Sequence, residues 1–530
     1  MRDLTVCLIW RRRHIKRNPI RLKKSFDVIV VGAGGSGLAA AYSAAEVGAS
    51  VLILEKRPQP GGTTGIAVGS FTAAETSLQR VAKIDDHWQD HAEDVSKFAT
   101  ADLECRNNQA LREFFLQHAS ETLHWLQSLG ISYVGPQPEP PNRVARMHNV
   151  VPGAKAYIAT LQLALQKKQA KLVCQAAVES LLEQDGRVIG VSATVDGQAE
   201  SFRARRGVIL AGGDYANNPD MIAKYKGSQF RHIEGINPDA TGEGHWLAEQ
   251  VGAQLLNMDV TYGPELRFIS SSRAPFQQFL PVTGIKARWL GQLVRHLPRW
   301  AMQRMIKRLL VTWQHPENAL FDDGAILVNR AGERFTDETK WPSREIAVAR
   351  QPAKEAFILL DGRLVNRYSQ WPHFISTAPE ISYAYVDDYR RLRPDVTILG
   401  NSLEEIAALP HFRHRPQALV ETVNQFNAVI QTSRSDQFGR ADFGHSLDSG
   451  PWVLLGPLKA YFTTTEGGAA INQRCEVLDQ RGMAIPGLFA VGQNGLGGMI
   501  LWGHGLHIAW AMTSGRLAGQ AVMRNRTGNA

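Results

Sequence analysis

Residues 26–37 read Phe-Asp-Val-Ile-Val-Val-Gly-Ala-Gly-Gly-Ser-Gly. The first six residues form an apolar run of strand length, rich in β-branched side chains, as in a parallel strand that is covered on both faces. The glycines at 32, 34 and 37 then match G-x-G-x-x-G. The first permits a tight turn, the second lets the backbone approach a pyrophosphate, and the third lets a helix pack on the strand. The alanine-rich residues 38–47 predict that helix, with its N-terminus towards the phosphates.

A second strand and an acidic residue complete this pattern. Residues 48–50 end the predicted helix, and residues 51–54 form a second buried strand. Glu55 stands at the end of that strand, where a carboxylate can accept hydrogen bonds from an adenosine ribose. Strand, turn, helix, strand and acid in this register predict a Rossmann-type dinucleotide-binding unit and an α/β fold.

Four later segments add to the glycine-rich turn. Residues 55–64 read Glu-Lys-Arg-Pro-Gln-Pro-Gly-Gly-Thr-Thr, and residues 207–213 read Gly-Val-Ile-Leu-Ala-Gly-Gly. Residues 241–244 read Thr-Gly-Glu-Gly, and residues 485–493 read Ile-Pro-Gly-Leu-Phe-Ala-Val-Gly-Gln. In this order they resemble the E-K…G-G-[NST], A-[TG]-G-G, G-D-G and I-P-G-L-[YF]-[GA]-x-G-E motifs of the fumarate reductase and succinate dehydrogenase flavoprotein family. The resemblance extends from about residue 26 to residue 522.

The resemblance implies an oxidoreductase that uses FAD. Members of the family that tether FAD through a histidine place it shortly after the G-G-[NST] turn, and residues 65–72 contain no histidine. We therefore expect the FAD to be bound without a covalent link. The expected FAD contacts, taken from the matching motifs, are Gly32, Ala33, Gly34, Ser36, Gly37, Glu55, Lys56, Gly62, Thr63, Thr64, Val178, Ala211, Gly212, Gly213, Glu243, Gly492, Gln493, Leu506 and Ile508.

Flavin-binding segments near both ends of the chain imply a discontinuous FAD-binding domain of Rossmann type. We expect it over residues 25–257 and 463–525, interrupted by an inserted α+β substrate-capping domain over residues 258–462. Within this cap, residues 325–335 read Ala-Ile-Leu-Val-Asn-Arg-Ala-Gly-Glu-Arg-Phe and resemble the family's I-L-V-N-x-x-G-x-R-F hairpin. The substrate is expected between cap and flavin, because ligand sites favour domain interfaces.

The positive charge of the chain is local. The net charge is +9, but residues 1–24 carry +8 and residues 284–315 carry +7, so the rest carries −6. This distribution does not favour nucleic acid as a partner. Residues 1–24 are expected to form a basic N-terminal arm. They do not resemble a secretion signal, because the short apolar run at 6–10 precedes the arginines at 11–13.

The second basic segment alternates cations with large apolar residues. Between residues 285 and 313 it contains seven Lys/Arg, no acidic residue, and an apolar set that includes Trp289, Leu293 and Trp300. An interfacial helix that contacts a membrane peripherally is one interpretation. The alternative is an amphipathic helix that packs on the cap.

The cysteines argue against bound metal. Cys7, Cys105, Cys174 and Cys475 lie far apart without a C-x-x-C pair, so neither a disulfide framework nor a zinc or iron–sulfur site is expected. A reducing, cytoplasmic compartment fits best, with peripheral contact at the inner face of the membrane as an option.

The chain departs from fumarate reductases where these hold a dicarboxylate with histidines and arginines. The family's H-P-T motif falls at Gly263-Pro264-Glu265, its H-H-T-M-G-G histidines fall at Thr463 and Thr464, and the arginine of H-G-A-N-R falls near Trp502. A desolvated dicarboxylate without paired cations is costly to bind. We therefore expect a larger, flatter and more neutral substrate.

A related branch, the 3-ketosteroid dehydrogenases, uses the same flavin domain on neutral cyclic ketones. Its Y-P-G-x-G-x-x-[IL]-G segment resembles residues 501–509 in the spaced glycines and in Ile508, while its tyrosine falls at Leu501. A distinct branch that desaturates ketones or reduces enones would fit this partial match.

Chemistry at a C–C bond beside a carbonyl needs an acid/base group and a hydrogen-bond donor to the carbonyl oxygen. Arg344 lies two residues later than the family's acid arginine after R-F-x-[ND]-E, and a salt-bridging arginine is the alternative. Tyr461 offers a phenol where the chain returns to the flavin, or it is simply packed. His504 stands between Gly503 and Gly505 in the segment expected to pass the flavin ring, and a buried structural histidine is the alternative.

Three functions therefore remain open. The first is a desaturase or reductase of a neutral, cyclic or steroid-like α,β-carbonyl compound, which exchanges electrons with a quinone-like or protein partner. The second is a fumarate-reductase-like enzyme for an anionic enoate, anchored by Arg344, Arg267 or Arg273. The third is a flavin-binding regulatory or nucleic-acid-associated protein that uses its basic arm.

Overall fold

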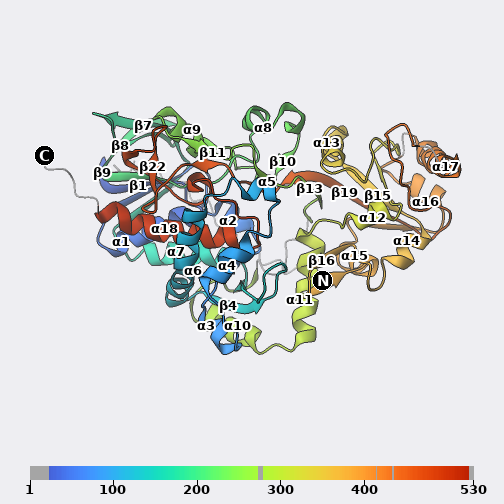
Figure 1. Cartoon of the computed structure of the whole chain (residues 1–530), viewed down its shortest axis with the longest axis horizontal. Coiled ribbons are helices and arrows are strands. Elements are labelled where there is room, and N and C mark those ends of the chain that lie inside the picture. Colours follow the sequence, from blue (N-terminus) through green and yellow to red (C-terminus); the bar gives the residue numbers. More distant parts are fainter. Residues whose placement is uncertain (1–22, 272–278, 413–414, 433–434, 525–530) are drawn as a thin grey trace, which may run out of the picture.

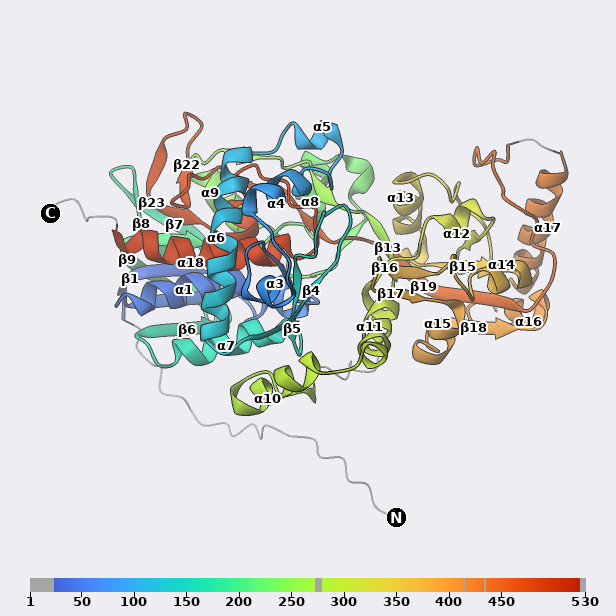
Figure 2. The same cartoon turned by 60° about the horizontal axis from the view of Figure 1, so that its bottom comes forward.

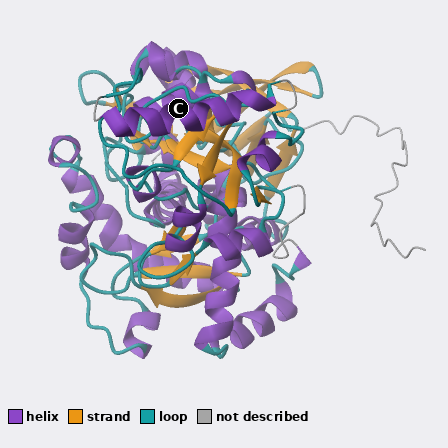
Figure 3. Ribbon diagram, turned by 90° about the vertical axis from the view of Figure 1, so that its right-hand side faces the viewer, coloured by secondary structure: helices purple, strands orange, loops and turns teal. Residues whose placement is uncertain are grey.

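The computed structural model describes residues 23–271, 279–412, 415–432 and 435–524. The expected basic arm up to residue 22, and Arg273, lie outside the described residues. Two groups of elements stand side by side in Figure 1, one around β1 and one around β15. We call them the first lobe and the second lobe. Figure 3, in which one group lies in front of the other, shows strands with helices around them.

The first lobe is organised by an eight-stranded sheet in the order β22-β23-β9-β1-β2-β6. The β1–β2, β1–β9, β2–β6 and β23–β9 pairs are parallel, and β7 and β8 extend β9 as an antiparallel ribbon. The strands are β1 (Ser25–Val31), β2 (Val51–Glu55), β6 (Ala170–Cys174), β7 (Ala176–Gln184), β8 (Arg187–Val195), β9 (Gln198–Leu210), β22 (Glu476–Leu478) and β23 (Ala484–Ala490). Because β23 comes from the end of the chain and pairs with β9, the Rossmann-type sheet is discontinuous, as the sequence predicts.

Two helices from opposite ends of the chain pack closely on each other in the first lobe. These are α1 (Gly35–Glu46) and α18 (Leu506–Arg524), and Figure 2 shows them side by side. A Cβ atom on Gly515 would lie 2.4 Å from the Ser36 carbonyl oxygen, and one on Gly519 would lie 2.4 Å from the Ala40 carbonyl oxygen. The glycines of α18 therefore set the distance between the two helices.

Smaller elements complete the first lobe. The helix α6 (Gln109–Ser128) packs on α18, and α7 (Lys155–Leu165) packs on α1. The remaining elements are α2 (Gly62–Ile66), β3 (Ser70–Thr72), α3 (Ser77–Val81), α4 (Trp88–Val95), α5 (Ala101–Glu104), β4 (Ser132–Gln137), β5 (Met147–Val151), α9 (Glu243–Gln250), β11 (Leu255–Leu256), β12 (Thr261–Tyr262), β20 (Thr464–Thr465), β21 (Gly468–Ala469) and η4 (Gly492–Gly495).

The second lobe is built on the long strand β19 (Trp452–Phe462), which pairs with four neighbours. Its sheet also contains β10 (Glu234–Gly235), β13 (Glu265–Phe268), β14 (Ile326–Val328), β15 (Ala356–Leu360) and β18 (Thr397–Gly400). The other elements are α8 (Pro219–Tyr225), η1 (Ser228–Phe230), α12 (Ala319–Asp322), α13 (Ser343–Ala349), η3 (Pro352–Lys354), α14 (Gly362–Arg367), β16 (Ser376–Ala378), β17 (Ser382–Ala384), α15 (Val386–Leu392), α16 (Leu403–Ala407) and α17 (Pro416–Thr432).

The buried apolar side chains form two clusters, one in each lobe. Tyr215, Ile222 and Ile233 belong to the second cluster, although the predicted boundary at residue 257 assigns them to the first domain. The hairpin predicted over residues 325–335 also differs from the observed strand pairing. Asn329 and Glu333 close a turn through a backbone hydrogen bond, but β14 pairs with β15 and not with the residues after the turn.

The basic apolar insert forms two helices rather than one. The first, α10 (Gly284–Arg295), packs on β4 and β5 of the first lobe. The second, α11 (Arg299–Trp313), packs on β13, β16, β17 and α15 of the second lobe. Figure 2 shows α10 below the first lobe and α11 beside the second. Among the described residues, no helix is both long enough and apolar enough to cross a bilayer.

The contact between α1 and α18 makes a prediction about stability. In Gly519→Ala, the new methyl group would overlap the backbone of Ala40, and a backbone atom cannot move aside cheaply. We expect a loss of about 1–3 kcal/mol in the free energy of unfolding, measured as a lower melting temperature. Gly153→Ala is the matched control, because nothing lies within 4 Å of its Cβ position. Equal melting temperatures for the two variants would contradict the close packing.

Candidate functional site

The glycine-rich turn after β1 forms a cradle at the N-terminus of α1. Gly32 has a φ of +104°, and a Cβ there would lie 2.4 Å from the Ala211 carbonyl oxygen. A Cβ on Gly37 would lie 2.1 Å from the Gly32 carbonyl oxygen. At Gly34, in contrast, no heavy atom comes closer than 3.9 Å. The first and third glycines are therefore required by packing, while the second leaves space beside the positive end of a helix, as a pyrophosphate needs.

Glu55 and Lys56 fix the loop that follows β2. The Ala33 N–H donates to Glu55 Oε2 at 2.7 Å, and the Arg57 N–H donates to Oε1 at 2.9 Å. Lys56 Nζ donates to the Asp239 carbonyl oxygen at 2.7 Å, to Thr241 Oγ1 at 2.6 Å and to Glu243 Oε1 at 2.7 Å. These bonds join β2 to the segment before α9, so both borders of the cradle are held in place.

A cavity of about 920 Å³ extends from this cradle towards the second lobe. Its size suits a dinucleotide with room for a second molecule. Most of the expected FAD contacts line it: Gly32, Gly34, Ser36, Glu55, Lys56, Gly62, Thr63, Thr64, Val178, Ala211, Gly212, Gly213, Glu243, Gly492, Gln493 and Ile508. Ala33, Gly37 and Leu506 are buried behind this lining. These features fit FAD. The open cradle at the N-terminus of α1 can hold its pyrophosphate, and the Glu55 carboxylate can accept hydrogen bonds from its ribose.

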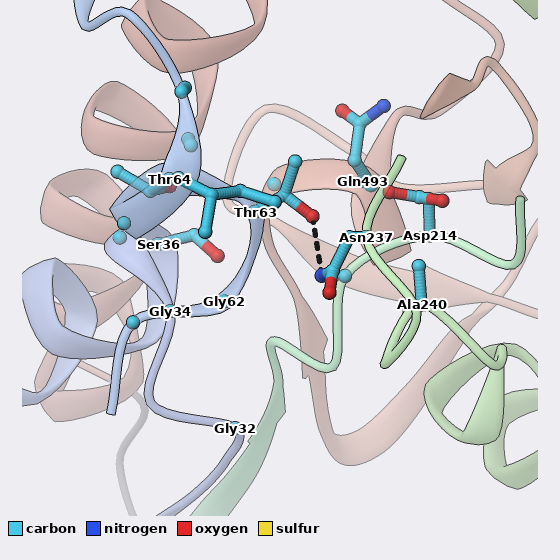
Figure 4. A pocket seen from close by; sticks show the side chains of 18 of the residues that line it. Gly32, Gly34, Ser36, Gly62, Thr63, Thr64, Asp214, Asn237, Ala240 and Gln493 are labelled. Atoms are coloured by element: carbon cyan, nitrogen blue, oxygen red, sulfur yellow. Dashed lines mark hydrogen bonds between the residues drawn. The ribbon is translucent and has the colours of Figure 1, made fainter. Parts of the chain in front are cut away.

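Polar side chains occupy the wall opposite the cradle. In Figure 4, Gly34, Ser36 and Gly62 lie on one side, and Asp214 and Gln493 lie on the other. Asn237 Nδ2 donates to Thr63 Oγ1 at 2.9 Å, the bond drawn in that view. Burial raises the pKa of Asp214 to about 6, although hydrogen bonds from the Ala216 N–H and the Thr464 hydroxyl oppose the shift. Asp214 directly follows the predicted Gly212-Gly213 turn but is not among the predicted site residues.

The end of the cavity near the second lobe contains three potential cations, and each has a carboxylate partner. Arg267 lies 2.6 Å from Glu265, His504 Nδ1 lies 2.5 Å from Glu139, and His507 Nε2 lies 2.7 Å from Glu466. All three cationic side chains line the cavity. Any positive charge that they carry is therefore compensated within the protein.

The Glu139 contact changes the protonation of His504. Burial lowers the pKa of His504, but the hydrogen bond and the negative charge of Glu139 outweigh it and raise the pKa above its ordinary value. The pKa of Glu265 shifts in the opposite direction. Burial raises the pKa of its carboxyl, but the charges of Arg267 and His315 and a hydrogen bond from Arg267 hold it below its usual range.

Two aromatic residues stand beside these pairs. Tyr262 and Trp502 both line the cavity, with ring centroids 5.9 Å apart in an edge-to-face arrangement. Burial and the nearby carboxylates Glu265 and Glu139 raise the pKa of Tyr262, so its phenol keeps its proton and can donate a hydrogen bond. The sequence resemblance predicts that an arginine of the fumarate reductases falls near Trp502, and the Trp502 side chain lines the cavity here.

The structure separates the three predicted catalytic residues. His504 lines the cavity, but Arg344 and Tyr461 do not. Arg344 is buried in the second lobe, where it donates to Glu345 at 2.6 and 2.9 Å and to the Glu338 carbonyl oxygen at 3.0 Å. Tyr461 lies on β19, where burial and then the charges of Glu234 and Glu355 raise its pKa to about 12.

Tyr262 and Glu139 are not among the site residues predicted from the sequence. Tyr262 directly precedes Gly263-Pro264-Glu265, so its position next to a recognised motif was a usable signal. Glu139 lies in a proline-rich stretch that carries no motif, and it meets His504 across 365 residues of sequence. No local pattern could have indicated that pair. Within the described ranges, no group of three or more His, Cys, Asp or Glu side chains could hold a metal ion.

Comparisons with known proteins agree with this geometry. A family model described as FAD binding domain matches residues 27–268 and 283–502. A fumarate reductase (cytochrome) from Shewanella frigidimarina is 26% identical over 507 residues, which cover 94% of this chain and 77% of that protein. A vinyl phenol reductase from Lactiplantibacillus plantarum is 27% identical and covers 89% of this chain and 90% of that protein.

Solved structures share the fold. The open conformation of a flavocytochrome c3 fumarate reductase superposes with a TM-score of 0.68 at 25% identity, covering 94% of this chain and 78% of that chain. A 3-ketosteroid Δ1-dehydrogenase from Sterolibacterium denitrificans gives a TM-score of 0.61 at 18% identity, covering 94% and 99%. The chain belongs to the FAD binding domain family and is an FAD-dependent oxidoreductase of the fumarate reductase and succinate dehydrogenase flavoprotein group.

Proposed function

We propose that this protein dehydrogenates, or in reverse saturates, a C–C bond next to the carbonyl of a neutral, cyclic or steroid-like ketone. Electrons pass to or from a quinone-like or protein partner. The pairing of Arg267, His504 and His507, the described cations at the end of the cavity near the second lobe, with carboxylates carries this proposal. Fumarate is a dianion and vinyl phenol is neutral, so the relatives alone do not select the charge of the substrate.

Charge compensation argues against a dicarboxylate. A buried carboxylate needs cations that are free to approach it, because desolvation of its charge is costly. Here Glu265, Glu139 and Glu466 already occupy Arg267, His504 and His507 and would repel an incoming anion. A neutral carbonyl needs only hydrogen-bond donors, which the Tyr262 hydroxyl and the His504 ring can supply.

The residues suggest a division of tasks. When bound, FAD supplies the hydride acceptor or donor for the β-carbon. Tyr262 donates a hydrogen bond to the carbonyl oxygen and stabilises the enolate-like charge that develops there. His504 exchanges the α-proton, and Glu139 holds its Nδ1 in place. The flat rings of Tyr262 and Trp502 form an apolar wall for a cyclic substrate. We further propose that FAD is bound without a covalent link.

An anionic enoate is the competing substrate. Of its three proposed anchors, Arg344 is tied to Glu345 outside the cavity, Arg273 lies outside the described residues, and Arg267 lines the cavity beside Glu265. Arg267 is therefore the observation that keeps this second function open.

A substrate panel separates the two functions. We expect anaerobic incubation with cyclic 3-ketones to bleach the flavin absorbance, or the corresponding enones to reoxidise dithionite-reduced protein, because neither substrate brings a charge near Glu265. Succinate and fumarate should do neither. Reaction with the dicarboxylates but not with the ketones or enones would overturn the proposal in favour of the anionic enoate.

The assignment of Tyr262 is tested by removing its hydroxyl. Tyr262→Phe should lower kcat by about 100-fold, as expected for loss of one donor to a developing oxyanion, with FAD absorbance unchanged. Tyr461→Phe tests the sequence-based candidate in parallel and should have little effect, because Tyr461 does not line the cavity. The reverse outcome would restore Tyr461 as the functional phenol.

The His504–Glu139 pair predicts a pH effect. Glu139→Gln removes the charge that raises the pKa of His504 but leaves the burial that lowers it. If His504 takes the α-proton, the rise of kcat/KM with pH reports its loss of a proton, so this rise should move to lower pH in the variant. Glu421→Gln, at an exposed position of α17, should leave the profile unchanged. An unshifted profile in Glu139→Gln would exclude His504 as the titrating group.

A further inference from the structure

The helix α10 exposes a row of large apolar side chains. Ile285, Trp289 and Leu293 are 73%, 74% and 62% exposed, and their four-residue spacing places them on one face of the helix. Phe279 before the helix and Trp300 after it are 79% and 68% exposed. Single exposed apolar residues are ordinary, but a continuous row of them indicates an interaction surface.

The opposite face of α10 fixes this orientation. Ala287, Gly291 and Val294 are buried, and a Cβ on Gly291 would lie only 2.5 Å from the Ser132 side chain on β4. Arg295 Nε donates to the Tyr133 carbonyl oxygen at 3.1 Å. The helix therefore docks on the first lobe through its small residues, and this docking holds the large residues outward.

The charges around the row indicate what it contacts. Lys286, Arg288 and Arg295 are exposed on the same helix, and residues 284–315 contain no acidic residue. A second copy of this face would bring like charges together, which is unfavourable. An anionic lipid surface matches both features, because it offers acyl chains to the apolar row and negative headgroups to the cations.

The insert is also continuous with the cavity. Val282, two residues before α10, lines the cavity, and so does Gln314, the first residue after α11. In contrast to α10, α11 buries Leu310 and Val311 in the second lobe, and Lys307 Nζ donates to Asp388 at 2.8 Å. The helix α11 is therefore held on the second lobe, although Trp300 in its first turn is exposed.

We propose that α10 is an interfacial helix that binds anionic lipid surfaces. Ile285, Trp289 and Leu293 enter the acyl boundary, and Lys286 and Arg288 contact the headgroups. This places the chain around Val282, and with it one wall of the cavity, next to the lipid. The inference does not depend on the identity of the substrate.

Flotation with vesicles tests the proposal on the full-length, FAD-loaded protein. The double variant Trp289→Ser/Leu293→Ser should bind mixed phosphatidylcholine–phosphatidylglycerol vesicles at least about tenfold more weakly than the unaltered protein does. Binding of the unaltered protein should also fall in high salt and on pure phosphatidylcholine vesicles. Trp371→Ser is the control, because it removes another exposed indole (63%) from the loop between α14 and β16. FAD absorbance and melting temperature confirm that each variant is folded.

Two results would overturn the proposal. Equal vesicle binding by the unaltered protein and the double variant would assign any lipid contact to another surface, such as the basic arm at residues 1–24. A second contrary result is that neither protein binds vesicles, while the unaltered protein is a dimer and the double variant is a monomer. This would show that α10 joins two copies of the chain. Neither measurement uses a substrate, so failure here leaves the proposed reaction standing.

Discussion

The contact between the glycine turn and the end of β9 is the constraint on which the rest of this structure depends. Gly32 touches the backbone of Ala211, and Gly37 touches Gly32, so β1, β9 and α1 meet without intervening side chains. This approach places the N-terminus of α1 at the mouth of the cradle. It also sets α1 where α18 can pack on it through glycines. The first and last parts of the chain are thereby joined around one cofactor site.

The ion pairs at the end of the cavity near the second lobe are a second feature of this structure. The cavity places cations beside carboxylates, from the same strand for Arg267 and Glu265 and across 365 residues of sequence for His504 and Glu139, and each pair leaves hydrogen-bonding capacity but little net charge. Such pairs are expensive to bury, and they gain little stability over apolar side chains of similar size. Their presence at the cavity is therefore better explained by chemistry and substrate choice than by folding.

The sequence predicts what local patterns specify. The β1–α1–β2 unit is predicted because strand, turn and helix have distinct periodicities over few residues, and the glycines around His504 place that residue by the flavin segment. The partners of Arg344 and His504 could not be predicted. No sequence pattern distinguishes Glu345 and Glu139 from other carboxylates, and only the folded chain brings them into contact with these two residues. The insert is likewise predicted only in part. Its composition indicates amphipathic helices, but only packing shows that α10 and α11 belong to different lobes.

That division of the insert has a geometric consequence. Arg295 anchors α10 to the first lobe, and α11 is packed along the second, so only residues 296–298 connect the two helices. A fully extended chain from residue 295 to residue 299 spans at most about 14 Å. The ends of the two helices cannot separate further unless one of them leaves its lobe. The amplitude of any rotation of the second lobe about the cavity is therefore limited by the length of a three-residue link.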